Sequence, residues 1–277
     1  MAGKKKDTSL LHHLIGSRSL VWNLAKNDIK KKFAGSYFGV VWAFVQPVIT
    51  VLLYWFVFEK GLNSKATDLR TGIEIPFVLW LTAGLVPWFY FQEALNGGTG
   101  VLVEYSYLVK KVVFQIDMLP VVKMISALFT HLFFVAFTIV LFICMGYMPD
   151  WYALQVIYYS FCMILFATGL VYATSAVTVF FRDMKEVVGI LLQIGMWVTP
   201  IMWNFETMVQ IPGWAIAVLK LNPMYYIVSG YRNALINHIG FWEDMGLTVY
   251  FWVVTAVLLF LGTTVFKKLQ PHFADVL

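Results

Sequence analysis

The part of the chain that most constrains its architecture reads VVGILLQIGMWVTPIMW at 187–203, followed by NFETMVQIPGWAIAVLKLNPMYYIVSGYRNALI at 204–236. The first piece is apolar for 17 residues, barely enough to cross a hydrocarbon core of about 30 Å at about 1.5 Å of rise per residue. The second piece holds two short apolar runs, 214–219 and 224–236, on either side of the Asn222-Pro223 break. Backbone at membrane depth must be helical, buried in protein or lining a cavity. We therefore predict that residues 204–246 form an outer gate built on a re-entrant pair of short helices.

Composition places the whole chain in the membrane class. Its 277 residues are 60% hydrophobic and only 13% charged, whereas soluble domains carry about 25% charged residues. The net charge of +5 does not indicate nucleic acid, because the basic residues cluster at predicted membrane edges, where they set orientation. Cys144 and Cys162 lie in apolar runs without disulfide or metal-ligand spacing, so we expect both to be packing residues.

Residues 1–33 carry no apolar core typical of a signal peptide, and we expect them to form a cytoplasmic N-terminal segment. From Leu20 onward, apolar residues share one broad helical face and polar residues share the other. Asp28 and Lys32 interrupt the apolar face, and their i,i+4 spacing predicts that they pair with each other. We predict an amphipathic helix over 20–33 that lies on the membrane surface. A basic retention signal without a further role is the alternative.

Residues 34–277 contain six apolar segments, and we predict that each spans the membrane: 37–58, 77–91, 121–145, 154–181, 187–203 and 247–266. If the N-terminus is inside, five basic residues fall outside (Lys60, Lys65, Arg70, Lys220 and Arg232), which leaves 15 of the 20 inside. This bias predicts that both termini are cytoplasmic. A seventh span over 224–236 would move the Lys267-Lys268 pair outside. The predicted fold class is thus an all-α polytopic membrane protein with six transmembrane helices.

Several functional classes lack the residues that they need. No Asp, Glu, Lys or Arg lies in the interior of a predicted span, which argues against an ion-coupled carrier. The chain has no GxxxxGK[ST] loop, no HExxH and no GxSxG motif. We therefore expect no catalytic residue, no metal site and no bound cofactor in this chain.

An inner loop of unusual composition reads NGGTGVLVEYSYLVKKVVFQIDMLP at 96–120. A glycine break is followed by an apolar run that contains Glu104, and then by Lys110-Lys111 and a second apolar segment. A short helix at the membrane surface, presented to a cytoplasmic partner, has this pattern, although a plain amphipathic connector is the alternative. The charged turn at 182–186 is a second candidate contact.

Short strings along the chain follow the order typical of one transporter family: NLAKNDIKKKFAGSYFGVVWAFVQPV at 23–48, YWFVFEKGL at 54–62, IPFVLWLTAGLVPWFYF at 75–91, LVKKVVF at 108–114, FFRDMKEV at 180–187, TPIMW at 199–203, LKLNPMYYIVSGYRNAL at 219–235 and HFADVL at 272–277. Over nearly its whole length, the chain resembles the membrane subunit of type-2 ABC exporters for lipid-linked cell-surface polymers. It is most similar to the permease of the wall teichoic acid exporter, and next to O-antigen and capsule permeases.

The resemblance implies a homodimer flanked by two copies of a separate ATPase subunit, which would bind ATP and Mg²⁺. The helix over 20–33 would be an interface helix, and 104–114 would fall in the coupling helix. The implied ATPase contacts are Glu104, Tyr105, Tyr107, Lys110, Lys111, Phe114, Arg182 and Asp183. The implied outer-gate residues are Trp203, Trp214, Tyr225, Tyr226 and Arg232. Family members often have Pro after the LVKKVVF string, and Gln115 stands there in this chain, so the end of the coupling segment differs.

A glycan cargo suits the distribution of aromatic residues, because sugar rings stack on aromatic faces. The candidate channel residues are Tyr37, Phe38, Trp42, Trp88 and Tyr90. An aromatic belt at the interface, or packing against lipid, is the alternative for each of them. The lipid carrier would bring a diphosphate to the inner leaflet, where Arg18, Lys30, Lys31 and Lys32 are candidate partners. Their ordinary role is to contact anionic lipid headgroups.

The sequence and the resemblance together predict ATP-driven export of a polyprenyl-diphosphate-linked polysaccharide, of teichoic acid or O-antigen type, across a bacterial plasma membrane. An ABC exporter of a small lipid or drug would share this architecture. A membrane enzyme acting on lipid-linked sugars is the alternative from another class. Such an enzyme needs a pair of carboxylates or histidines at the membrane face, and the sequence offers no convincing pair.

Overall fold

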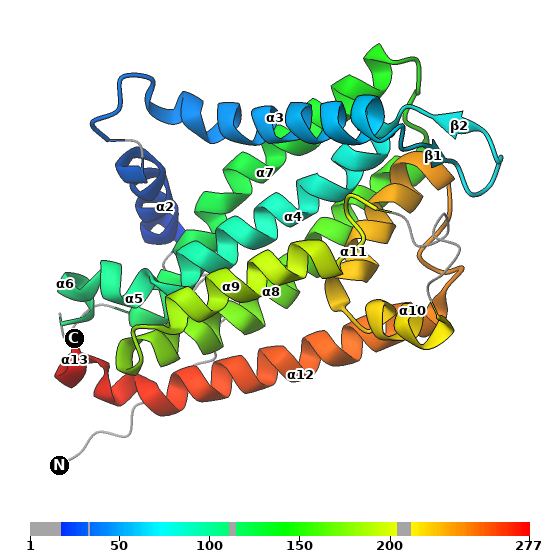
Figure 1. Cartoon of the computed structure of the whole chain (residues 1–277). Helices are drawn as coiled ribbons and strands as arrows, with labels where there is room; N and C mark the ends of the chain where they lie inside the picture. The colour runs from blue at the N-terminus through cyan, green and yellow to red at the C-terminus, as the bar shows by residue number, and fades with distance from the viewer. Residues whose placement is uncertain (1–17, 33, 111–114, 204–211) are drawn as a thin grey trace.

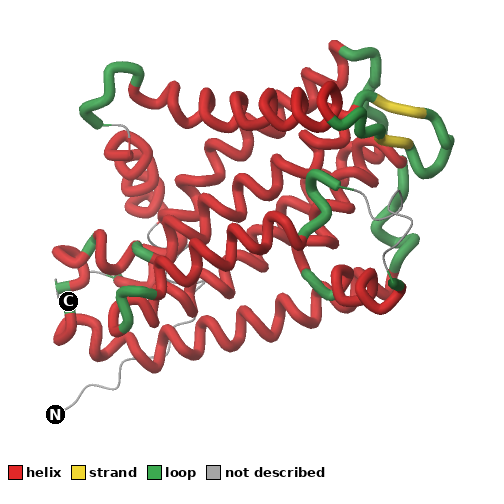
Figure 2. Tube along the Cα trace, viewed as in Figure 1, coloured by secondary structure: helices red, strands yellow, loops and turns green. Residues whose placement is uncertain are grey.

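The computed structural model describes residues 18–32, 34–110, 115–203 and 212–277. Nearly all of the regular structure in these ranges is helical, and one small antiparallel sheet pairs Ala66 with Ile75 (Figure 2). The longer elements are α2 (Arg18–Lys32), α3 (Trp42–Trp55), α4 (Phe77–Thr99), α7 (Leu119–Cys144), α8 (Gln155–Phe180), α9 (Met184–Val198) and α12 (Met245–Leu269). The shorter ones are β1 (Ala66–Thr67), β2 (Glu74–Ile75), α5 (Val101–Glu104), α6 (Ser106–Val109), α10 (Gly213–Lys220), α11 (Pro223–Arg232) and α13 (Phe273–Val276).

The long helices run side by side between two ends of the molecule (Figure 1). One end carries α5, α6, α13 and the C-terminus, and we call it the α5–α6 end. The opposite end carries the β1–β2 hairpin and α10, and we call it the hairpin end. Helix α4 is the most enclosed element, because α7, α8, α9 and α11 all pack against it.

Four helical segments are long and apolar enough to cross a membrane: Gly39–Gly61, Ile116–Cys144, Trp151–Phe180 and Met245–Val276. This confirms the prediction of an all-α polytopic membrane protein. Helix α4 extends to Thr99, eight residues beyond the predicted end at residue 91. Helix α9 has 15 residues, or about 22 Å at about 1.5 Å each, which is less than the thickness of a bilayer core.

Helix α9 ends five residues before the predicted end of its span at residue 203. Proline disfavours helical backbone in the residue before it, and Thr199 precedes Pro200. Accordingly, Thr199 has extended backbone angles, with φ −74° and ψ 126°. The chain thus leaves the helix at Val198, and the carbonyl groups that follow need partners other than a helical turn.

The two short helices predicted between 204 and 246 are present as α10 and α11 at the hairpin end (Figure 1). Asn222 caps α11, because its side-chain oxygen accepts a hydrogen bond from Met224 N, and Pro223 occupies the first turn. Helix α11 packs against α4 and α8 and continues as a π-helical turn over Asn233–Asn237. None of the residues of α10 is buried. The pair therefore consists of one buried helix and one exposed helix.

Helices α8 and α12 make a close contact that depends on two glycines. A Cβ atom added to Gly262 would lie 2.0 Å from the carbonyl oxygen of Gly169, and one added to Gly169 would lie 2.7 Å from the backbone carbon of Leu258. Small residues let helix backbones approach in this way, and this approach is a main source of helix association in membranes.

Changing Gly262 to alanine should therefore destabilise the protein by about 1–3 kcal/mol, since a backbone atom must move to admit the methyl group. Gly189→Ala in α9 is the matched control, because a Cβ at Gly189 meets nothing within 4 Å. That control should be neutral or stabilise α9 by up to about 1 kcal/mol. Thermal unfolding of the purified variants in one detergent measures both effects. Equal unfolding temperatures for the two variants would contradict the proposed contact.

Candidate functional site

A cluster of four polar residues joins three elements at the α5–α6 end. Lys123 Nζ, in the first turns of α7, lies 2.6 Å from Asp28 Oδ1 of α2 and 2.8 Å from Glu104 Oε2 of α5. The hydroxyl of Tyr105 donates a hydrogen bond of 2.8 Å to the same oxygen of Asp28. We call Asp28, Glu104, Tyr105 and Lys123 the Lys123 cluster. One lysine thus connects the surface helix α2 with the α5–α6 segment and with α7.

The core of this cluster is shielded from water. The side chains of Asp28 and Lys123 are 5% and 13% exposed, whereas Glu104 is about half exposed. Burial, together with the hydrogen bond to Asp28, raises the pKa of the Tyr105 hydroxyl well above its ordinary range, so Tyr105 stays a proton donor. Removing one partner of such a buried pair leaves an uncompensated charge, which is strongly destabilising.

The predicted pairing of Asp28 with Lys32 is wrong. Asp28 lies on the same buried face of α2 as Val21 and Ala25, which pack against Met118 and Val122 at the start of α7. Its carboxylate therefore reaches Lys123, whereas Lys32 points away and lies 2.5 Å from Glu93 Oε1 of α4. The tertiary contact replaces the local i,i+4 pair, because the aspartate faces the protein and the lysine faces solvent.

The residues predicted to contact an ATPase gather at the α5–α6 end. Glu104 and Tyr105 belong to the Lys123 cluster, and Tyr107 beside them is about half exposed. Lys31 Nζ lies 5.2 Å and 5.7 Å from the ring centroids of Tyr105 and Tyr107. Lys110 directly follows α6 and is exposed, as are Arg182 and Asp183 in the turn between α8 and α9. Lys111 and Phe114 lie outside the described residues.

The four basic residues predicted to meet a phosphate group all lie exposed on α2. Arg18 begins the helix, and Lys30, Lys31 and Lys32 form its last turn. Two of these lysines have partners within the chain: Lys31 lies over tyrosine rings, and Lys32 pairs with Glu93. The headgroup role of the four residues stays a prediction.

The structure does not bring the predicted channel aromatics together. Tyr37, Phe38 and Trp42 are exposed and meet edge to face, with ring centroids 5.3 Å and 5.8 Å apart. Trp88 and Tyr90 are each only 2% exposed. They lie inside the protomer because α4 is enclosed by its neighbours. Trp88 packs on Gly195 of α9, and Tyr90 lies against His131 of α7.

The predicted gate residues differ widely in their environment. Trp214 on α10 is 73% exposed, and Trp203 and Tyr225 are half-buried. Tyr226 is buried, and its hydroxyl lies 3.0 Å from that of Tyr158 and 3.1 Å from Thr248 Oγ1. These contacts join α11 to α8 and α12.

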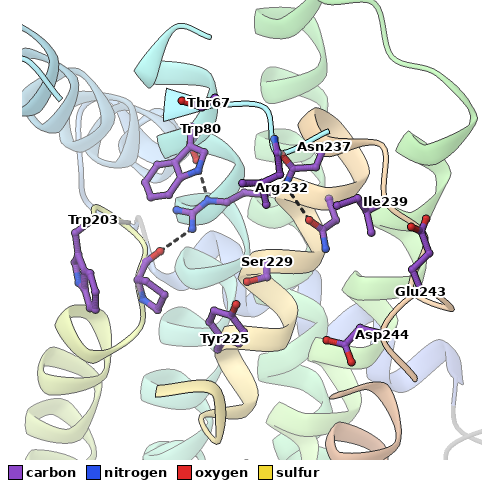
Figure 3. A pocket seen from close by; sticks show the side chains of 13 residues that line it. Thr67, Trp80, Trp203, Tyr225, Ser229, Arg232, Asn237, Ile239, Glu243 and Asp244 are labelled. Carbon is purple, nitrogen blue, oxygen red and sulfur yellow. Dashed lines mark hydrogen bonds between the residues drawn. The ribbon is translucent and has the colours of Figure 1, made fainter. Parts of the chain in front are cut away.

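Arg232, the last residue of α11, is buried, although the charge distribution placed it in an outer segment. Its guanidinium lies 3.3 Å from the ring centroid of Trp80. Nη1 donates a hydrogen bond of 2.7 Å to the carbonyl oxygen of Pro200 (Figure 3). Nη2 donates one of the same length to the carbonyl oxygen of Ile201. Gly84 provides the space, because a Cβ there would lie 2.7 Å from Nη2. Arg232 therefore satisfies the carbonyl groups that the end of α9 leaves open.

A cavity of about 290 Å³ lies beside Arg232 at the hairpin end. Its lining comes from the β1–β2 hairpin, α4, the segment after α9, α11 with its π-helical turn, and the loop before α12 (Figure 3). We call it the hairpin-end pocket. The residues that line it are Thr67, Leu69, Trp80, Pro200, Trp203, Tyr225, Ser229, Arg232, Asn233, Asn237, Ile239, Glu243 and Asp244.

Sequence reasoning did not single out Lys123 or His131. Lys123 is a single cation at the start of an apolar span, and Asp28 is a single anion on the apolar face of a helix. A charged residue in such surroundings needs a partner of opposite charge, and this signal could have predicted the pair. His131 Nε2 lies 3.1 Å from the Tyr231 hydroxyl and 3.2 Å from Ser160 Oγ. This histidine lies within an apolar helix and has no sequence neighbour that predicts its partners.

The model of the ABC-2 type transporter family matches residues 19–236. The chain belongs to the ABC-2 type transporter family. Two relatives cover nearly the whole of this transporter chain. The O-antigen export system permease protein RfbA of Myxococcus xanthus is 25% identical over 266 residues, 96% of this chain and 98% of its own length. The protein of the same name from Klebsiella pneumoniae is 22% identical over 258 residues, 92% of this chain and 93% of its own length.

This family membership confirms the prediction of a type-2 ABC exporter membrane subunit. Members of this family form the transport subunit, and ATP is hydrolysed in a separate subunit. Together with the four long apolar helices, the family also places the chain in the bacterial plasma membrane.

Replacing Lys123 with methionine should lower the free energy of unfolding by about 3 kcal/mol, because two carboxylates lose their cation. The double variant Asp28→Asn with Lys123→Met should recover part of that loss. Lys65→Met is the control, since Lys65 pairs with Glu74 on the exposed hairpin and should cost less than about 1 kcal/mol. Unfolding in detergent measures all three variants. If Lys123→Met were no worse than Lys65→Met, the cluster would not stabilise the fold.

Proposed function

We propose that this chain is the permease of an ATP-driven exporter that moves a polyprenyl-diphosphate-linked polysaccharide from the cytoplasmic to the outer side of the membrane. The observation that carries the proposal is the match to O-antigen export permeases over 96% of this chain and 98% of the relative. Because the alignment covers both proteins almost completely, this chain has a counterpart for nearly every segment of such a permease. The cargo is of O-antigen or teichoic acid type.

The α5–α6 end faces the cytoplasm in this proposal. Basic residues gather there on α2, at Lys110, in the turn at Arg182 and in the last turn of α12 at Lys267 and Lys268. Cytoplasmic segments of membrane proteins carry this excess. In this proposal, α4 is a fifth crossing, and α9 together with the segment 199–203 after it is a sixth, so that both termini are cytoplasmic. The short pair α10 and α11 then lies at the outer side as the re-entrant gate.

Two copies of the chain, each with one ATPase subunit, form the transporter that we propose. Helix α3 supports a second copy, because Val51 is its only residue that is buried within the protomer. The exposed aromatic row Tyr37, Phe38 and Trp42 precedes and begins this helix. It offers rings to a sugar chain that passes between the copies. Arg18 and Lys30 face the inner leaflet, where the diphosphate of the carrier arrives.

The Lys123 cluster gives a physical route from ATP hydrolysis to the membrane helices. The ATPase docks on the exposed side of α5 and α6, where Tyr107 and Lys110 are accessible. Any displacement of α5 acts through Glu104 and Tyr105 on Lys123 and Asp28, and so on α7 and α2. Lys32 passes the displacement of α2 to Glu93 of α4. Because these ion pairs and the hydrogen bond of Tyr105 join separate elements, a displacement of one element acts on the others.

Gentle affinity purification from native membranes, with mass spectrometry of the protein and lipid that follow the chain, tests the proposal. We expect an ATPase with a P-loop at equal stoichiometry and a glycan on a polyprenyl diphosphate. Recovery of a small lipid in place of the glycan would contradict the cargo. A folded chain recovered without any ATPase would contradict the exporter itself.

Reversing the charge of Lys110 should weaken the ATPase contact at least about tenfold, since like charges across an interface cost several kcal/mol. Lys110→Glu should still insert and fold, because the side chain is exposed. Lys60→Glu, an exposed lysine at the hairpin end, is the matched control. Recovery of ATPase with each purified variant is the measurement. An equal yield with both variants would remove Lys110 from the interface.

A further inference from the structure

We propose that the hairpin-end pocket binds one sugar unit of the glycan at the outer side of the membrane. This inference rests on the proposed export function and adds a binding site to it. The pocket lies at the end of the molecule opposite the Lys123 cluster, between the β1–β2 hairpin and α11 (Figures 1 and 3). A cargo that leaves the membrane on that side passes the elements that line it.

The size of the pocket selects a small ligand. Its volume of about 290 Å³ is at the lower limit of the roughly 300–1,000 Å³ that is typical of small-molecule sites. A single sugar ring fits such a space, whereas a polymer segment of several rings does not. The pocket therefore suits a terminal unit or a branch of a glycan.

The polar groups of the lining are held in place before any ligand arrives. Asn237 Nδ2 donates to Asn233 Oδ1 at 2.8 Å, and its Oδ1 accepts from the backbone of Leu69 at 3.1 Å. One oxygen of Glu243 accepts from Gly240 N at 2.8 Å, and one oxygen of Asp244 accepts from Leu247 N at 3.0 Å. Side chains fixed in this way lose little conformational freedom when they bind.

Hydrogen-bonding capacity remains on the same groups. Among the described residues, no hydrogen bond is found to the second carboxylate oxygen of Glu243 or of Asp244. The same is true of the hydroxyls of Ser229 and Thr67, which also line the pocket. Carboxylate oxygens accept, and hydroxyls both donate and accept. This set matches the hydroxyl groups of a sugar, which also both donate and accept. Trp203 and Tyr225 add aromatic rings, on which the apolar face of a sugar stacks (Figure 3).

The charges of the lining argue against other ligands. The guanidinium of Arg232 is directed at the carbonyl oxygens of Pro200 and Ile201 and at the face of Trp80, so its strongest contacts are within the chain. The two carboxylates of Glu243 and Asp244 repel an anionic group. An acyl chain would leave the second carboxylate oxygens of Glu243 and Asp244 without partners, which is costly. A neutral, hydroxyl-rich ligand remains.

Binding of delipidated glycan to the full chain, purified with its ATPase in lipid nanodiscs, tests the inference. The probe is the surface polysaccharide of the native host, released from its carrier by mild acid, and saturation-transfer NMR and calorimetry detect binding. Ser229→Leu fills the pocket, and Trp203→Leu removes an aromatic wall. Ser229→Ala removes one hydroxyl with little risk to the fold. Trp151→Leu is the matched control, because Trp151, just before α8, is 85% exposed and does not line the pocket.

We expect Ser229→Leu and Trp203→Leu to weaken glycan binding at least about tenfold and Ser229→Ala to weaken it severalfold, with Trp151→Leu unchanged. Glycan that binds the wild type and all variants equally would overturn the pocket inference while leaving the export function intact. Failure of the wild type to bind glycan would also overturn it. In that case, lipid-linked glycan recovered with the complex from native membranes shows whether the proposed function survives.

Discussion

The arrangement of the hairpin end depends on Arg232, which donates hydrogen bonds to the backbone carbonyl groups directly after the end of α9. Pro200 ends α9 before it is long enough to cross a bilayer core, and the carbonyl oxygens of Pro200 and Ile201 would otherwise lack donors. The planar guanidinium supplies two donors in a fixed fork, and Trp80 covers its face. Without this contact, the carbonyl groups of Pro200 and Ile201 would lose their donors, and the pocket beside them would lose a wall.

Helix α4 carries contacts to both ends of the molecule. Near its start, Trp80 and Gly84 receive Arg232, and nearer its end, Glu93 binds Lys32 of α2. Between them, α4 is enclosed by α7, α8, α9 and α11. A densely packed helix of this kind does not deform gradually. The proposed coupling from the ATPase side to the gate therefore has a rigid element along which to act.

The two ends use charge in different ways. At the α5–α6 end, Lys123 lies between two carboxylates on different elements, so the ion pairs hold separate parts together. At the hairpin end, Arg232 bonds to backbone carbonyls and an aromatic ring, and it fixes one local arrangement. The ion pairs of Lys123 suit the proposed transmission of movement between helices. The contacts of Arg232 suit the defined shape that the proposed gate and sugar site require.

The sequence by itself determined the membrane class, most helix positions and the family. Hydropathy marks long apolar helices, Asn222-Pro223 begins α11 through a cap and a proline, and motif order identifies the exporter subunit. Only the tertiary structure decided which faces are buried. Hydropathy cannot distinguish a lipid-facing side chain from one that is packed in protein. The sequence therefore grouped Trp88 and Tyr90 with Tyr37 and Phe38 as channel candidates, although Trp88 and Tyr90 are buried on α4, which its neighbouring helices enclose. Likewise, Asp28 has a lysine four residues away in sequence, but its face of α2 turns toward Lys123, and contacts between distant residues are set by packing.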